Sequence, residues 1–251
     1  SKKQQFNSKT FANELATVNE KIDGLETQFN EFEAGSFSDT TVLDGKAVFD
    51  VGSVDTDDDG YTGETQFMYT YTMNLNTSFT GDDNLYTRIK TGNHSSWSKT
   101  KSVYNTYLSS GNGNGDTLKV DKLWYTTPVG ENHTITIGPK IENYYMHATT
   151  PSIYEPVLKA FTLGGNAAGY GASTSPGIGW AYTADNGFAI SSNITSKNPV
   201  FTDQAKQSWA TQIGYTQPNY SVSALVNMKY NGWTDSYFMT TDGKARSGDG
   251  N

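Results

Sequence analysis

The residues best suited to chemistry in this sequence form an acidic cluster. Asp55, Asp57 and Asp59, followed by Gly60, match the first half of a D-x-D-x-D-G calcium loop, whose carboxylates would bind a hard cation. The twelfth position of such a loop, where a bidentate Glu belongs, is Gln66. The match is therefore partial, and a solvated acidic loop explains the same residues.

The usual signatures of an enzyme are missing from the sequence. His94, His133 and His147 do not have the spacing of metal ligands, and there is no nucleophile elbow, P-loop or HExxH motif. Because the chain has no cysteine, thiol chemistry and disulfide bonds are excluded. We therefore expect a protein that is not an enzyme and that holds neither a cofactor nor a resident metal.

Six charged residues are candidates to line a water-filled channel instead. Three lie on predicted strands and three in one long connection; they are Arg88, Lys90 and Lys229, and Glu142, Glu155 and Lys159. Arg88 and Lys90 share the strand face opposite Leu85 and Ile89, because side chains alternate across a strand. Ordinary solvated charges would explain the same residues.

The elements that must position these charges are almost all predicted to be strands. In residues 66–79, apolar side chains such as Phe67, Tyr69 and Tyr71 alternate with Thr and Asn over about 14 residues, whereas a strand usually has roughly 5–6. A strand that crosses a bilayer needs about 9–11 residues. The predicted strands are 42–51, 64–80, 85–91, 117–129 with a bulge near Leu123–Tyr125, 134–138, 178–184, 187–194, 207–216 and 220–230, with a weaker tenth near 234–241.

The connections between these strands alternate in length. Tight turns are predicted at 81–84, 130–132, 185–186 and 217–219, and long connections at 52–63, 92–116, 139–177 and 195–206. This alternation is typical of an up-and-down membrane barrel, which has short periplasmic turns and longer loops at the other end. The connection 139–177 is rich in aromatic residues, which suits a loop folded into the lumen.

Composition limits the remaining classes. The net charge of −8 argues against nucleic acid as a partner, since phosphate binding needs clustered Lys and Arg. With 35% hydrophobic residues and a mean hydropathy of −0.61, the chain cannot be a helical membrane protein. A barrel fits, because its lipid face uses only every second residue. The chain opens on polar residues, so we expect either a leader that has been removed or a partial chain.

The first 35 residues differ from the rest and predict a coiled-coil helix, followed by a barrel over residues 36–251. An apolar seam repeats at spacings of four and three over about three heptads; its residues are Phe11, Leu15, Val18, Ile22, Leu25, Phe29 and Phe32. Large rings in the seam suit the wider core of three helices, so we expect a homotrimer with the helix in the periplasm. A single amphipathic helix lying on its own domain is the alternative.

Residues 32–49, 74–93 and 120–130 carry a resemblance to a known family. They are similar to the cyanobacterial outer-membrane porins, which are also named iron-uptake porins and are related to the carbohydrate-selective porins. In that family a peptidoglycan-binding SLH domain precedes a coiled coil and a barrel. No SLH domain occurs in this chain, and its end at 248–251 has a loop composition, so we expect about ten strands of a larger barrel, as an open curved sheet.

The resemblance implies a porin in the outer membrane of a cyanobacterium. Its function would be passive diffusion of ions, including iron, and of small hydrophilic solutes such as carbohydrates. The alternative is a trimeric extracellular fibre or adhesin with a coiled-coil stalk, which would explain the heptads but not the alternation of short and long connections.

Overall fold

The computed structural model describes residues 17–22, 24, 40–55, 63–94, 98, 106–150, 156–163, 167–170, 173–197, 199–200, 202–231 and 233. The chain divides into two compact units, Ser1–Val42 and Leu43–Asn251. In the first unit, residues 17–22 and 24 are helical, and the side chains of Val18 and Ile22 are exposed. The other positions of the predicted heptad seam lie outside the described residues.

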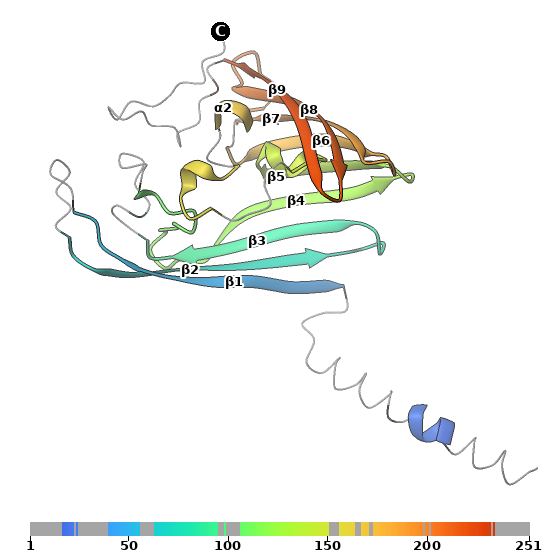
Figure 1. Ribbon diagram of the computed structural model, residues 1–251, viewed down its shortest axis with the longest axis horizontal. Helices are drawn as coiled ribbons and strands as arrows, with labels where there is room; N and C mark the ends of the chain where they lie inside the picture. The colour runs from blue at the N-terminus through green and yellow to red at the C-terminus, as the bar shows by residue number, and fades with distance from the viewer. Residues whose placement is uncertain are drawn as a thin grey trace, which may run out of the picture. The chain divides into compact units, whose positions relative to one another are not determined.

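The second unit is built on one antiparallel sheet in which every strand pairs with its neighbours in sequence order. The nine described strands are β1 (Thr41–Gly52), β2 (Gln66–Thr77), β3 (Asn84–Gly92), β4 (Lys119–Val129), β5 (His133–Ile141), β6 (Ser175–Thr183), β7 (Phe188–Ser196), β8 (Gln207–Gln217) and β9 (Tyr220–Tyr230). Figure 1 shows that the sheet is curved and open, with β1 and β9 at its two edges. The predicted all-β, up-and-down topology and the open sheet are confirmed. The weak tenth strand lies outside the described residues.

Tight turns and long connections alternate along the sheet as predicted. The turn between β2 and β3 begins earlier than expected, and Asp83 explains why. Its carboxylate accepts hydrogen bonds from the backbone N–H groups of Phe79 and Thr80 and from the hydroxyl groups of Ser78 and Tyr125. The Tyr125 hydrogen bond, aided by the others, holds the pKa of Asp83 well below its ordinary value. β2 therefore ends at Thr77 rather than near Thr80.

The pairing of β4 is irregular on both sides. Towards β3, Arg88 pairs with Lys122 and Ile89 with Val120, so Asp121 is an extra residue in a bulge. Towards β5, the register shifts between Leu123 and Tyr125, which confirms the predicted bulge. β5 continues past its predicted end at Gly138 because a shifted register tolerates Pro139, which has no N–H to donate.

The two faces of the sheet have the reverse of the burial expected for a protein in water. On β8, the side chains of Ser208 and Gln212 are buried, whereas those of Trp209, Ile213 and Tyr215 are 42%, 49% and 40% exposed. β2 and β7 share this pattern. We call the buried polar side the inner face, on which Thr70, Thr72, Ser191, Asn193, Ser208 and Gln212 lie. We call the apolar side the outer face, on which Phe49, Phe67, Ile137, Ile178, Val222 and Val226 lie.

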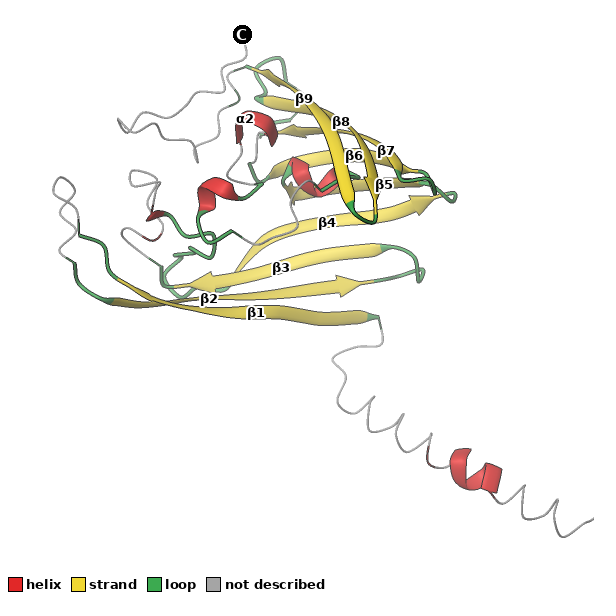
Figure 2. Cartoon of the chain, in the orientation of Figure 1, coloured by secondary structure: helices red, strands yellow, loops and turns green. Residues whose placement is uncertain are grey.

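The connection between β5 and β6 covers part of the inner face. It contains the short helices η3 (Asn143–Met146), η4 (Lys159–Phe161) and α2 (Ala167–Tyr170), which Figures 1 and 2 show within the concave side of the sheet. η3 packs against β6 and β7. A side chain at Gly179 would collide with Met146, so glycine is required for this close approach. In the part of the chain that the structure describes, none of the helices combines the length and apolar character that a membrane crossing requires.

Candidate functional site

The inner face holds two adjoining pockets. The larger has a volume of about 790 Å³ and lies between β1–β4 and the β5–β6 connection. Its charged lining residues are Asp44, Lys46, Arg88, Lys90, Asp121, Lys122, Glu142 and Lys159. It is therefore a hydrophilic space bounded on one side by strands and on the other by an inserted loop.

Arg88 links the strand wall to the inserted loop. The guanidinium forms an ion pair with the carboxylate of Asp121, the extra residue of the β4 bulge. It also donates a hydrogen bond of 3.2 Å to the Tyr145 hydroxyl of η3. The Tyr145 ring lies against Trp124, which stacks on Tyr86 with ring centroids 4.2 Å apart. These contacts hold the guanidinium in one position on the inner face of the sheet.

A second ion pair joins the wall to the loop deeper in the structure. Lys122 Nζ lies 3.0 Å from Glu142 Oε1, and the two side chains are only 2% and 9% exposed. Lys122 also donates to the Thr174 hydroxyl, and Tyr144 donates to Glu142. Burial alone would raise the pKa of Glu142, but the charge of Lys122 and the Tyr144 hydrogen bond offset it, so this pKa is lowered. Both ends of the β5–β6 connection are thus anchored at Lys122.

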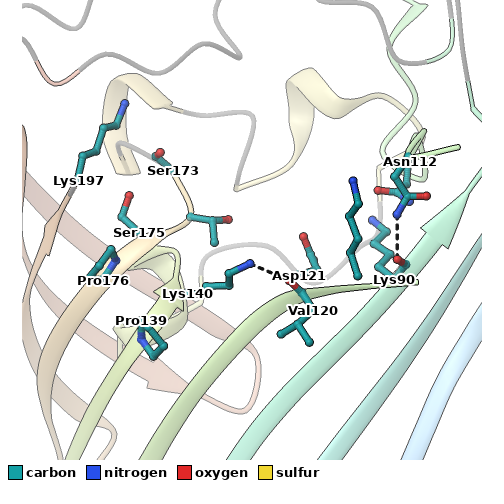
Figure 3. A pocket seen from close by; sticks show the side chains of 13 residues that line it. Lys90, Asn112, Val120, Asp121, Pro139, Lys140, Ser173, Ser175, Pro176 and Lys197 are labelled. Atoms are coloured by element: carbon teal, nitrogen blue, oxygen red, sulfur yellow. Dashed lines mark hydrogen bonds between the residues drawn. The ribbon is translucent and has the colours of Figure 1, made fainter. Parts of the chain in front are cut away.

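The smaller pocket has a volume of about 690 Å³ and adjoins the first at Lys90 and Asp121. Its charged lining residues are Lys90, Lys119, Asp121, Lys140 and Lys197. Figure 3 shows that Lys90, Asp121 and Lys140 come from neighbouring strands, and that Lys140 donates a hydrogen bond of 2.9 Å to the Val120 carbonyl. Among the charged residues of this pocket, four are cationic and one, Asp121, is anionic.

The structure brings four of the six predicted channel-lining residues together. Arg88, Lys90, Glu142 and Lys159 all line the larger pocket. Lys229 also belongs to the inner face, opposite Ser208, but it lines neither pocket. Glu155 lies outside the described residues, as do Asp57 and Asp59. Asp55 is described, and no group of three or more His, Cys, Asp or Glu that could hold a metal occurs among the described residues.

Several pocket residues were missed by the sequence analysis. Asp121 and Lys122 follow each other in the chain and both line the larger pocket, which simple alternation does not allow. The bulge at Asp121 is the cause. The sequence signal that could have indicated it is an acidic residue directly followed by a basic one within a predicted strand. The end of β5 adds Lys140, which lies beyond the predicted end of that strand, and the start of β4 adds Lys119, which lies within the predicted strand 117–129.

Asp50, His94 and Ser98 have the order of contacts found in a catalytic triad. His94 Nε2 lies 3.1 Å from Asp50 Oδ2, and His94 Nδ1 lies 3.3 Å from Ser98 Oγ. Ser98 is fully buried, however, and its hydroxyl donates to the sulfur of Met68. A nucleophile needs access to its substrate. We therefore interpret these contacts as a link between β1, β2 and the connection that follows β3.

The position of His147 predicts that the docking of the β5–β6 connection on β7 depends on pH. Its Nδ1 lies 3.1 Å from Ser191 Oγ on β7, its ring lies beside Tyr170 of α2, and burial lowers its pKa to about 4. Because the docked state favours neutral imidazole, the stabilisation is complete above the ordinary pKa near 6.5 and is lost as the pH falls towards 4.

We expect protonation of His147 to weaken docking by up to about 3 kcal/mol. Amide exchange protection factors for residues 143–149 should be lower near pH 4 than at neutral pH. In His147→Asn, which cannot take up a proton in this range, the protection should vary much less with pH. Equal pH dependence in both proteins would contradict the role given to His147.

Comparisons with known proteins add relatives but no activity. No protein-family model matches the chain. It is 30% identical to the uncharacterized protein alr4550 of Nostoc sp. over 168 residues. The aligned region covers 63% of this chain and 28% of alr4550. It is 29% identical to the uncharacterized protein sll0772 of Synechocystis sp. over 187 residues. The aligned region covers 67% of this chain and 34% of sll0772. The chain thus spans about a third of the length of the curated relatives it matches.

Proposed function

We propose that this chain forms part of the wall of an outer-membrane porin, a water-filled channel for passive diffusion of ions and small hydrophilic solutes. The observation that carries the proposal is the inverted sheet, with a polar inner face and an apolar outer face. An exposed apolar surface that extends over many strands needs an apolar partner. Lipid supplies one over the whole face, and the polar inner face then lies towards water.

The distribution of aromatic residues on the outer face supports a lipid environment. Exposed rings near the tight turns are Phe79, Phe188, Tyr215 and Tyr220, and those near the long connections are Phe49, Phe67, Trp209 and Tyr230. The aliphatic residues Ile213 and Val226 lie between the two groups. Membrane barrels have two such girdles of rings, one at each lipid–water boundary. The strands, of 9–12 residues, have the length that a tilted crossing needs.

A closed barrel and a coiled coil belong to the same proposal. Backbone groups cannot remain unpaired in lipid, so the edges at β1 and β9 require further strands to complete the barrel. In the described part of the helix, Val18 and Ile22 are 50% and 46% exposed, which leaves apolar side chains available to a partner helix. Association of three helices in the periplasm would produce a homotrimer in which each subunit keeps its own pore.

The direct test is conductance. The purified full-length protein, reconstituted into planar lipid bilayers, should produce discrete conductance steps. Bilayers that receive the same detergent without protein should remain silent. If the protein inserts into lipid, as judged by co-flotation with vesicles, but produces no steps, the channel function is wrong.

Extraction of cell envelopes distinguishes a porin from the alternative, an extracellular fibre. A chain whose outer face contacts lipid should leave the envelope only when detergent is added. A fibre with a soluble β-structure should be released by shear or by buffer alone.

A further inference from the structure

The two pockets of the inner face carry charge of the opposite sign to the chain as a whole. Together they are lined by eight cationic side chains and three carboxylates, an excess of five positive charges, in a chain whose net charge is −8. Two of the carboxylates, Asp121 and Glu142, are already in ion pairs with Arg88 and Lys122. The third, Asp44, accepts hydrogen bonds from amides on β2. The positive excess therefore resides in the lysines of the lining.

The placement of two of these lysines has a cost. Lys90 on β3 lies directly opposite Lys119 on β4, and the preceding inner-face pair on the same strands is Arg88 opposite Lys122. Like charges in cross-strand positions destabilise a sheet. The repulsion between Arg88 and Lys122 is offset because each forms an ion pair with a carboxylate, Asp121 and Glu142 respectively. Among the described residues, no carboxylate lies within ion-pair distance of the Lys90 or Lys119 ammonium group.

Further hydrogen-bond donors, one charged and one neutral, lie near Lys90 and Lys119. Lys140 lines the smaller pocket beside Lys119, and its hydrogen bond to the Val120 carbonyl leaves its positive charge unneutralised. Asn112 lies beside Lys90 in Figure 3, and its Nδ2 is buried without an acceptor among the described residues. Three ammonium groups and an amide N–H donor suit a small inorganic anion, which accepts hydrogen bonds from all of them.

We infer that the channel selects small inorganic anions, with Lys90, Lys119 and Lys140 as the residues that determine this selectivity. The inference rests on the proposed channel function and names the class of solute. A basic ring inside a pore raises the local concentration of anions and lowers that of cations. An anion that passes between Lys90 and Lys119 also relieves their mutual repulsion. The binding remains weak enough for release because the pockets are open to water.

The test uses the purified full-length protein in planar bilayers that separate two potassium chloride concentrations. The reversal potential should show that chloride is more permeant than potassium. Each of Lys90→Gln and Lys119→Gln should lower the chloride-to-potassium permeability ratio by about sevenfold, because one unit charge at roughly 7 Å in water favours chloride by about threefold and disfavours potassium by the same factor. In Lys90→Glu/Lys119→Glu, which reduces the excess of five positive charges in the lining to one, the preference for chloride should be largely lost. Lys206→Gln, which removes the same charge from an exposed residue outside both pockets, should leave the ratio unchanged.

Each outcome has a different meaning. Conductance with a preference for potassium in the unmodified protein would overturn the anion inference and leave the channel in place. An equal chloride-to-potassium ratio in the unmodified protein and in Lys90→Glu/Lys119→Glu, with both forming channels, would also overturn the anion inference and leave the channel in place. The absence of any conductance would overturn the channel function and the inference with it.

Discussion

Replacement of Lys122 by Met should reduce the stability of the folded unit by about 3–5 kcal/mol, because Glu142 would keep its charge in a buried place without its partner. Methionine fills much of the volume of the lysine chain, so the loss would arise from charge rather than from a cavity. Urea unfolding in lipid vesicles, followed by tryptophan fluorescence, measures this difference in free energy.

The double variant Lys122→Met/Glu142→Gln is the matched control. It removes both charges, so it should be much closer in stability to the unmodified protein than the single variant. In Lys122→Met alone, burial should raise the pKa of Glu142 above its ordinary value. The lost stability should then return as the pH falls and Glu142 becomes neutral. Equal losses in the single and double variants would show that the ion pair does not hold the loop.

Substitution of Val226 by Arg should have the largest effect on the outer face. This side chain is 65% exposed and lies in the middle of β9, between the two groups of aromatic residues. In water, such a surface substitution changes stability by no more than about 0.5 kcal/mol. Arginine at the midplane of a bilayer costs about 2–4 kcal/mol. The free energy of unfolding in vesicles therefore reports what covers this face.

Leu225→Arg supplies the control at the same depth. Leu225 is the neighbouring residue and belongs to the inner face, so its guanidinium would enter the water-filled side. Its cost in vesicles should be clearly smaller than that of Val226→Arg. Val226→Arg should also reduce the yield of protein that floats with vesicles. If both substitutions had the same cost, lipid would not be the partner of the outer face.

Periodicity predicted most strands because they have a polar and an apolar side over nearly their whole length. For β9 the predicted and observed bounds are identical, since Tyr220 follows a tight turn and alternation continues to Tyr230. The errors occur where a side chain rather than alternation ends or bends a strand. Asp83 ends β2 by binding the N–H groups of Phe79 and Thr80, and no pattern within β2 reveals this.

The candidate site was predicted less completely than the strands. Arg88 and Lys90 could be assigned to one face because that assignment needs only local alternation. The pairing of Lys122 with Glu142 depends on how a connection returns across the sheet, and residues 20 apart carry no local signal of it. The position of Asp121 in the lining of the larger pocket depends on a register shift between two strands, which only the paired structure reveals.

Among the described strands, β1 and β9 are the two edges of the sheet, and this has a consequence for the proposed assembly in a membrane. Each presents a row of backbone N–H and C=O groups along a strand of 11–12 residues, and each such group costs several kcal/mol if it enters hydrocarbon unpaired. A sheet with open edges is therefore far less stable in lipid than one whose edges are paired. In the proposed porin, entry into the bilayer and pairing of the edges would then occur as one cooperative step, without a stable half-inserted intermediate.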